Sequence, residues 1–434
     1  MRAARTLHGR VTLLASLAFG SNGLNLGIIS FALVGLKAAW GLTPGQAGLL
    51  VTASGAGQLT GGLLIGYVAD SLGRRLAFAA TVTLSSLSLG AAAFAPSLPV
   101  LALLLLLGGA GFGGVAPVAT SLIGEFAPPA SRGALMGWTQ VVWVLGWIVA
   151  ALGGVVLAHG IAWRTMFAVG LLPVALAAVG FSLVPESPRY LLAHGRRREA
   201  EALAQTLADR FGTRPELPPQ ERAGRVSLRA HLGELWSPRF RQRSIVLWAV
   251  WFVMIAAYNG PVVLLPALLV AAGFPDAARA ALVVSVVMAL PVVAATLLID
   301  RVGRKPVIIA GLGTAALGAW GMGGATGEAG LVVAAIFLAG GVLSAWPVIL
   351  SYAAELYPTR IRATAVGWAS AAGRIGAILA PAVLGVLLHS WTGGRGVALG
   401  VFACALVIAA LIVLFLGEET AGRSLEDVAE AAGG

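Results

Sequence analysis

The chain has 434 residues, of which 58% are hydrophobic and only 11% are charged, and its mean hydropathy is +0.90. This composition leaves too little polar surface for a water-soluble globular protein, so that class is excluded. The formal net charge of +11 does not indicate nucleic-acid binding, because the sequence has no basic stripe interleaved with exposed aromatic residues.

Apolar runs of about twenty residues recur along the chain, each long enough to cross a hydrocarbon layer as a helix. The 58 glycines and 21 prolines favour helices over barrel strands. We therefore predict an all-α membrane protein with about twelve transmembrane helices. The predicted spans, in chain order, are 11–36, 46–69, 76–95, 98–125, 133–158, 163–184, 244–271, 278–299, 306–326, 330–354, 363–388 and 394–416.

Basic residues mark one side of the membrane. Lys37, Arg164, Arg279 and Arg395 fall on one side and Arg374 lies inside a span, whereas the others of the 29 Lys and Arg lie at the N-terminus, in the alternate loops, in the central loop and in the tail. Because positive residues are enriched on the cytoplasmic side, both termini and the central loop are predicted to be cytoplasmic. We expect a multi-pass protein of the inner membrane.

The chain repeats itself at an offset of 230 residues. Since an even number of spans separates the copies, we predict two six-helix bundles in parallel orientation, at 1–185 and 243–434. The linker at 186–242 is predicted to hold an amphipathic helix over 197–211, with Leu203, Leu207 and Phe211 on one face. The repeated residues are Asp70, Gly73, Arg74, Glu125, Pro128, Arg132, Gly137, Trp138 and Gly146, which recur as Asp300, Gly303, Arg304, Glu355, Pro358, Arg362, Gly367, Trp368 and Gly376.

Several loop motifs resemble the major facilitator superfamily of transporters. The segment Gly66–Arg75 resembles its loop 2–3 signature, 300–305 resembles the second copy, and 185–189 and 419–426 resemble motifs of the sugar-porter and organic-ion branches. The resemblance implies alternating access, in which two halves rock around a central cavity. We expect a gating network of helix-end charges; the alternative is that they only fix the topology. The gating candidates are Asp70, Arg74, Glu125, Arg132, Asp300, Arg304, Glu355 and Arg362.

Three later segments resemble the organic-anion and niacin-type branch of this superfamily. They are 251–260, the run 355–367 and its continuation 373–381. The paired glutamines that hexose carriers have in helix 7 are missing, which makes a sugar the less favoured substrate. The resemblance therefore implies a small organic anion such as nicotinate or a benzoate. The alternative is a neutral polar solute, or a drug that is exported.

Arg374 carries most of the substrate inference. It lies about eleven residues into its predicted span and hence near the middle of the bilayer. A guanidinium keeps its proton, and no acidic residue of the sequence lies at similar depth in any span. We predict that a substrate carboxylate pairs with it through two parallel hydrogen bonds. The alternative is that backbone carbonyls or hydroxyl groups satisfy this side chain.

Other polar and aromatic residues complete a predicted lining for a flat aromatic monocarboxylate. Gln140, Trp143 and Trp147 share one helical face by their spacing, and the resemblance points Gln140 and Trp147 toward the substrate. Each aromatic alone has the alternative of a core or lipid-facing position. The remaining candidates are Asn22 and Asn25 in the first span, Tyr258 and Asn259 in the seventh, and Trp346 and Tyr352 in the tenth.

The chemistry of the spans limits the mechanism. Many proton-coupled relatives in the resembling family carry an acid where Asn22 or Asn25 stands and an arginine where Leu105 stands. We therefore expect either facilitated transport or symport in which the proton travels with the substrate–Arg374 pair. The sequence shows no Cys/His cluster, metal-ligand spacing or nucleophile motif, so we expect no enzyme activity, cofactor or metal. The expected partners are the organic anion, possible co-transported protons and the lipid bilayer, and the expected state is a monomer.

Overall fold

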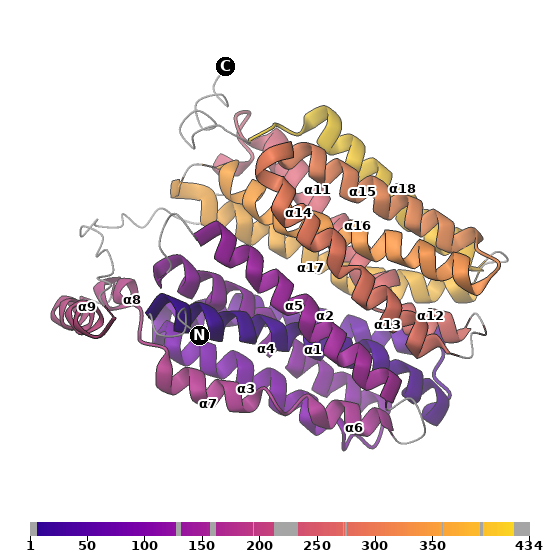
Figure 1. Ribbon diagram of the computed structural model, residues 1–434, viewed down its shortest axis with the longest axis horizontal. Coiled ribbons are helices and arrows are strands. Elements are labelled where there is room, and N and C mark those ends of the chain that lie inside the picture. The colour runs from indigo at the N-terminus through magenta and orange to yellow at the C-terminus, as the bar shows by residue number, and fades with distance from the viewer. Residues whose placement is uncertain are drawn as a thin grey trace. The chain divides into compact units, whose positions relative to one another are not determined.

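The computed structural model describes residues 7–126, 132–156, 162–193, 195–211, 233–271, 273, 276–357, 359–390 and 394–420 (Figure 1). Within these ranges the secondary structure is helical, which confirms the all-α prediction. The first half contains α1 (Leu7–Trp40), α2 (Pro44–Leu72), α3 (Arg74–Ala92), α4 (Leu98–Phe126), α5 (Arg132–Val156), α6 (Ala162–Val169) and α7 (Val174–Leu183). The second contains α11 (Arg241–Ala257), η3 (Tyr258–Val262), α12 (Leu265–Ala271), α13 (Ala277–Val287), α14 (Ala289–Val302), α15 (Arg304–Gly324), α16 (Glu328–Glu355), α17 (Thr359–Ser390) and α18 (Gly394–Leu416).

Eleven helices among the described residues are long and apolar enough to cross a membrane. The predicted span 46–69 is not among these eleven, although it falls within α2, which has 29 residues. At 1.5 Å per residue, a helix of this length reaches about 43 Å, enough for a bilayer core. The protein is therefore a multi-pass membrane protein with a helix at each of the twelve predicted positions.

Three predicted spans are interrupted helices. The predicted span 163–184 is α6 followed by α7, with Pro173 just before α7, and the span 278–299 is α13 followed by α14, which meet at Met288. The span 244–271 is α11, the π-helical turn η3 and α12. Because Pro261 lies inside η3 and lacks an N–H group, a regular hydrogen-bond ladder cannot run through this turn.

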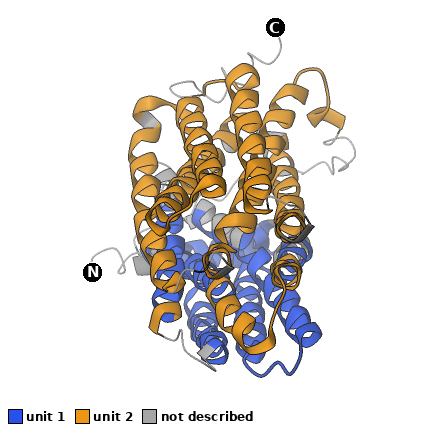
Figure 2. Ribbon diagram, turned by 90° about the vertical axis from the view of Figure 1, so that its right-hand side faces the viewer, with its two compact units in different colours: residues 1–29, 53–153, 161–224 blue, residues 30–52, 154–160, 225–434 orange. Residues whose placement is uncertain are grey.

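The chain divides into two compact units (Figure 2). Unit 1 comprises residues 1–29, 53–153 and 161–224, and unit 2 comprises residues 30–52, 154–160 and 225–434. The segment 30–52, which comprises the end of α1, the short connection and the start of α2, thus groups by its contacts with the helices of the second repeat. The predicted domain boundaries at 185 and 243 stay a prediction, because they follow the repeat rather than the contacts.

The same helix crossing occurs in both repeats. In unit 1, a Cβ atom added to Gly146 of α5 would lie 1.9 Å from the carbonyl oxygen of Gly20 in α1. In unit 2, a Cβ atom added to Gly376 of α17 would lie 2.6 Å from the carbonyl oxygen of Phe252 in α11. Only glycine allows the helices of each pair to approach so closely. Gly146 and Gly376 are related by the offset of 230 residues, so this shared geometry supports the internal repeat.

In the described part of the linker, α8 (Pro188–Ala193) and α9 (Arg197–Phe211) follow the first repeat. The bounds of α9 agree with the predicted amphipathic helix. Ala200 and Ala204 are fully buried, and Leu203 packs against the hydrophobic core of unit 1. Of the predicted apolar face, Leu203 therefore packs against unit 1. The side chains of Leu207 and Phe211 lie outside the described residues.

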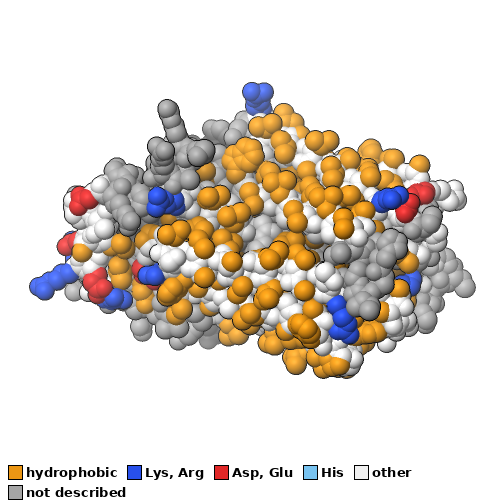
Figure 3. Space-filling model, turned by 60° about the horizontal axis from the view of Figure 1, so that its bottom comes forward, with side chains coloured by type: hydrophobic (Ala, Val, Ile, Leu, Met, Phe, Trp, Pro, Cys, Tyr) orange, Lys and Arg blue, Asp and Glu red, His pale blue; other side chains and the backbone are white. Residues whose placement is uncertain are grey.

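On the face that Figure 3 shows, hydrophobic side chains lie over much of the described surface. Large apolar residues are also exposed on the helices of unit 2, among them Leu290, Leu297, Leu317 and Trp320. Exposed apolar side chains of this kind are expected on a membrane protein, because its spanning helices face lipid rather than water.

Candidate functional site

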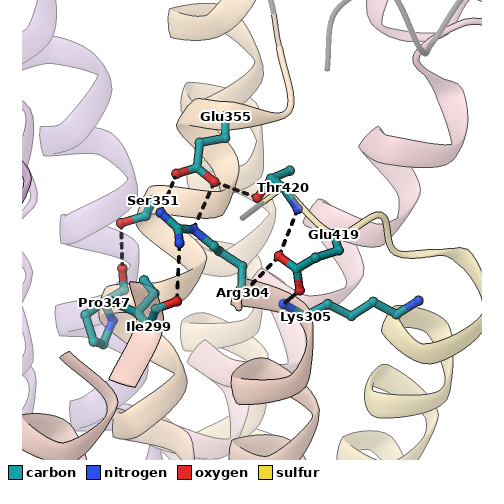
Figure 4. A network of polar contacts seen from close by, with 8 residues as sticks. All are labelled: Ile299, Arg304, Lys305, Pro347, Ser351, Glu355, Glu419 and Thr420. Carbon is teal, nitrogen blue, oxygen red and sulfur yellow. Dashed lines mark hydrogen bonds and ion pairs between the residues drawn. The ribbon is translucent and has the colours of Figure 1, made fainter. Parts of the chain in front are cut away.

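A network of charged and polar groups surrounds the start of α15 in unit 2 (Figure 4). The guanidinium of Arg304 donates two hydrogen bonds to the carboxylate of Glu355 at the end of α16, from Nε over 3.1 Å and from Nη2 over 3.0 Å. Both side chains are shielded, with 14% and 23% of their surfaces exposed. The predicted pairing of a helix-end acid with a helix-end arginine is therefore present in the second repeat.

Glu419 completes this network from the segment after α18. Its carboxylate accepts backbone N–H groups of Arg304 and Lys305, each over 3.0 Å. It thereby caps the N-terminus of α15, where free N–H groups and the helix dipole favour a negative charge. The Thr420 hydroxyl donates to Oε2 of Glu355 over 2.5 Å. The adjacent residues Glu419 and Thr420 therefore cap α15 and contact its ion pair, respectively.

Glu186 caps the equivalent helix of the first repeat. Its Oε1 atom accepts the backbone N–H of Arg74 over 2.8 Å and that of Arg75 over 3.4 Å at the start of α3. The glycines before the two helices, Gly73 and Gly303, have φ angles of 104° and 102°, which side chains other than glycine rarely adopt. A Cβ atom at Gly73 would also lie 2.4 Å from the carboxylate of Glu186. Both repeats thus combine a left-handed glycine with a carboxylate cap.

Only part of the predicted gating set can be placed. Arg304 and Glu355 form an ion pair, and the backbone of Arg74 is capped by Glu186. Sequence reasoning assigned no role to Glu186 and Glu419, although both stand in the quoted motifs and could have been found as acids at equivalent places after the sixth and twelfth spans. The side chains that lie outside the described residues are those of Asp70, Glu125, Arg132, Asp300 and Arg362.

Arg374 lies on α17 beside the crossing with α11. A Cβ atom at the preceding residue, Gly373, would lie 2.5 Å from the ring of Trp251 in α11. Trp251 in turn meets Trp346 of α16 edge to face, with ring centroids 6.4 Å apart. Arg374 is half-buried and follows Ala365, the start of the apolar part of α17, by nine residues. This separation corresponds to about 14 Å along the helix, near the middle of a bilayer core.

Tyr258 and Asn259 lie in the π-helical turn η3, and both are buried. The wide turn is closed by a hydrogen bond from the Val263 N–H to the Tyr258 carbonyl over 2.9 Å. The side-chain amide of Asn259 donates to the Ile255 carbonyl over 3.1 Å. Such turns occur often at functional sites, because they redirect side chains from a regular helix. Sequence reasoning selected these two residues but did not predict the π-helical turn.

Tyr352 has a different environment from the other predicted lining residues. Its hydroxyl accepts the backbone N–H of Glu418 over 3.0 Å, and its side chain is buried near the end of α16. Glu418 also receives two hydrogen bonds from Arg243, over 2.8 and 2.6 Å. Tyr352 therefore contacts the same segment after α18 as the charge network. Its predicted role in substrate binding stays a prediction.

The predicted lining residues of unit 1 lie on two sides of α1. Gly23 of α1 faces α5, since a Cβ atom there would lie 1.9 Å from the Trp143 carbonyl oxygen. In α5, Trp143 and Trp147 are stacked with centroids 6.0 Å apart, and Gln140 is buried. Asn22 instead donates to the Phe112 carbonyl of α4 over 3.3 Å. The structure thus brings the tryptophans together but does not bring Asn22 to them.

Two hydroxyl groups join the segment 30–52 to helices of the second repeat within unit 2. Ser30 of α1 donates to the carbonyl of Val263, which directly follows η3. Thr52 of α2 donates to the carbonyl of Ile378 in α17 over 2.9 Å. Both hydroxyls were missed in the sequence, because single serines and threonines in apolar spans carry no recognisable pattern.

Comparisons with known proteins agree with this architecture. A family model described as "Sugar (and other) transporter" matches residues 11–432. The niacin transporter NiaP of Acinetobacter baylyi is 36% identical over 94% of this chain and 93% of its own length. The putative niacin/nicotinamide transporter NiaP of Bacillus subtilis is 28% identical over 95% of this chain and 96% of its own.

Among solved structures, the proton:xylose symporter XylE, a member of the major facilitator superfamily, shares the fold. Its TM-score is 0.75 at 22% identity, over 97% of this chain and 98% of that chain. The sequence resemblance to this superfamily is therefore confirmed. The chain belongs to the sugar (and other) transporter family of the major facilitator superfamily and is a membrane transporter.

Proposed function

We propose that the protein carries a small aromatic monocarboxylate, such as nicotinate or a benzoate, across the inner membrane by alternating access. The observation that carries this proposal is the fixed positive charge of Arg374 in the middle of α17. No Asp or Glu lies in the interior of any predicted span, so the sequence offers no negative charge at this depth. The guanidinium keeps its proton and hence its positive charge at physiological pH. An anionic substrate would neutralise it during transport.

The surroundings of Arg374 suit an acid with a ring. Trp251 and Trp346 meet beside Gly373, so aromatic surface lies next to the residue that precedes the arginine. Planar guanidinium groups hold carboxylates through two parallel hydrogen bonds, and aromatic side chains pack against flat rings. In unit 1, considered by itself, Trp143 and Trp147 are stacked with ring centroids 6.0 Å apart.

The relatives support the same substrate class. The relative with 36% identity over nearly the whole chain is named a niacin transporter, and niacin is an aromatic monocarboxylate when ionised. A neutral sugar-like solute or an exported drug is the alternative from the sequence, and a neutral solute would form no charge-assisted contact with Arg374. The positive-inside pattern supports cytoplasmic termini. We further propose that the protein works as a monomer, which light scattering of the purified protein will test.

A thermal-shift experiment with purified protein tests the substrate class. Nicotinate and nicotinamide share one ring and differ at the carboxylate, so we expect nicotinate to raise the melting temperature and nicotinamide to raise it much less. Arg374→Ala should abolish the response to nicotinate, whereas Arg279→Ala, which removes an exposed arginine near Asp276, should keep it. A nicotinate response that persists in Arg374→Ala would contradict the proposal.

Uptake into proteoliposomes separates the two coupling modes. Facilitated transport predicts that nicotinate uptake follows its own gradient and does not change when an inward proton gradient is imposed at constant external pH. Symport in which the proton travels with the substrate–Arg374 pair predicts clear stimulation by that gradient. A permeant weak acid of similar size in protein-free liposomes serves as the control for passive leakage.

A further inference from the structure

A small cavity lies inside unit 1, between α1, α2, α3 and α4. Its volume is about 10 Å³. Most of its lining is apolar, but three polar side chains face it from different helices: Asn25 of α1, Ser54 of α2 and Ser85 of α3. Leu105 and Phe112 of α4 close it on the remaining side. It lies on the face of α1 that meets α4, away from the stacked tryptophans of α5.

Asn25 brings unmet hydrogen-bonding capacity to this cavity. Its side chain is only 5% exposed, and neither Nδ2 nor Oδ1 has a hydrogen-bond partner among the described residues. One turn earlier, Nδ2 of Asn22 donates to the Phe112 carbonyl, while its Oδ1 likewise lacks a partner within the described ranges. Buried amide groups are nearly always hydrogen-bonded, so this arrangement points to a small polar ligand.

The size and chemistry of the cavity decide which ligand fits. A site of about 10–15 Å³ with two to four polar partners holds one water molecule. The Asn25 amide supplies a donor and an acceptor, and Ser85, whose hydroxyl already donates to the Val82 carbonyl over 3.1 Å, keeps its lone pairs free to accept. A cation is disfavoured because no carboxylate lines the cavity. An aromatic acid is excluded, because pockets for such ligands measure about 300 Å³ or more.

We infer that this cavity binds one ordered water molecule, held by Asn25, Ser54 and Ser85, and that Asn25 serves the interior of the first bundle rather than the substrate. The hydrogen bond from Asn22 to the Phe112 carbonyl and the water bound by Asn25 then form two neighbouring polar contacts, which fix the register of α1 against α4. The water site does not depend on the proposed substrate, whereas the nicotinate readout that tests the role of Asn25 rests on the proposed function. It changes the role that the sequence predicted for Asn25.

Radiolytic hydroxyl-radical labelling of the full-length protein tests the water site. Radicals formed from a bound water label neighbouring side chains that bulk solvent does not reach. Leu105 lines the cavity at 1% exposure, and Leu101, one turn earlier on the same helix, is 0% exposed and does not line it. We expect Leu105 to be labelled several-fold faster than Leu101 in the wild-type protein. Equal rates would overturn the water site, and this comparison needs neither a variant nor a substrate.

Asn25→Leu tests the assignment of the amide. Leucine has a similar size but no polar atoms, so we expect the labelling of Leu105 to fall to that of Leu101 while nicotinate still raises the melting temperature. If the nicotinate response is lost while the labelling of Leu105 stays high, Asn25 belongs to the substrate site and the inference is wrong. Should Asn25→Leu fail to fold, Ser54→Val removes a second polar partner, and unchanged labelling of Leu105 in that variant would equally overturn the inference.

Discussion

The two repeats share one backbone geometry but present different chemistry beside it. Gly146 and Gly376 make the same close crossing, yet Val144 and Arg374 occupy equivalent positions two residues earlier. Likewise, the first repeat has Trp147 where the second has Ala377. At these two equivalent positions the first repeat thus has Val144 and Trp147, whereas the second has a positive charge and a small alanine. Duplication kept the residues that bring the helices together and changed those that flank the crossing, where a substrate would be recognised.

The largest expected effect comes from erasing this difference at the charged position. Arg374→Val gives the second repeat the residue that the first repeat has. Losing a bidentate, charge-assisted contact removes about 3 kcal/mol, so we expect nicotinate affinity to fall about a hundredfold. The measurement is the concentration dependence of uptake into proteoliposomes.

Arg374→Lys is the matched control, because it keeps the charge but not the two parallel hydrogen bonds. We expect it to retain part of the uptake. If Arg374→Val transports nicotinate as well as the wild type does, the charge has a structural role and the contrast between the repeats says nothing about substrate.

The crossing itself supplies the second test. A Cβ atom would meet a backbone carbonyl oxygen at 1.9 Å in Gly146→Ala and at 2.6 Å in Gly376→Ala. Backbone yields less easily than a flexible side chain, so we expect losses of about 3 kcal/mol and about 1 kcal/mol, respectively. The melting temperatures of the purified variants provide the measurement.

The same two helices offer controls for this test. Gly153 of α5 and Gly367 of α17 have open space where a Cβ would lie. Alanine there should be neutral or stabilising, because it favours the helix. Equal melting temperatures for Gly146→Ala and Gly153→Ala would show that the crossing tolerates a wider separation than the structure has.

Removing a helix cap should destabilise the protein less than closing the glycine crossing does, and by a similar amount in both repeats. Glu186→Gln and Glu419→Gln each remove the negative charge at a helix N-terminus, which should cost about 1 kcal/mol. Fraying would expose the Arg74–Arg75 and Arg304–Lys305 pairs, so the variants should be cleaved faster by trypsin in inside-out vesicles. Glu328→Gln, an exposed acid in the first turn of α16, is the control. Cleavage at the wild-type rate would argue against the caps.

Sequence reasoning was successful where a regular pattern determines the structure. Apolar runs located the helices, an amphipathic pattern predicted α9 with its bounds, and the repeat identified Arg304 and Glu355. It was less successful in predicting the contacts of a residue, because these depend on how each helix is oriented toward its neighbouring helices. Spacing alone could not show that Asn25 faces α4 rather than α5.

Contacts between distant segments were also beyond the sequence. Tyr352 was expected in the lining, but its hydroxyl meets the backbone of Glu418, 66 residues later. The interrupted helices were predicted as continuous spans, because hydropathy registers apolar length and not the hydrogen-bond ladder that Pro261 breaks. The substrate-facing surfaces of the two units remain predictions for the same reason.

The smallest expected effect on stability comes from substituting Tyr357. The equivalent residue of the first repeat is Ala127, which has no phenol. Burial raises the pKa of the Tyr357 phenol to about 12, although a hydrogen bond with the Ser244 hydroxyl opposes this. Because the unfolded value is about 10, the protonated phenol contributes its full stability below about pH 10, and this contribution is lost as the pH rises through 12. Tyr357→Phe removes the hydrogen bond, which is worth about 1 kcal/mol. Because phenylalanine does not titrate, the variant also lacks the loss of stability that deprotonation of the phenol causes at high pH. The melting temperatures of wild type and variant should therefore converge between pH 9 and pH 12. A constant difference across that range would mean that this phenol titrates normally and that the contact with Ser244 is open to water.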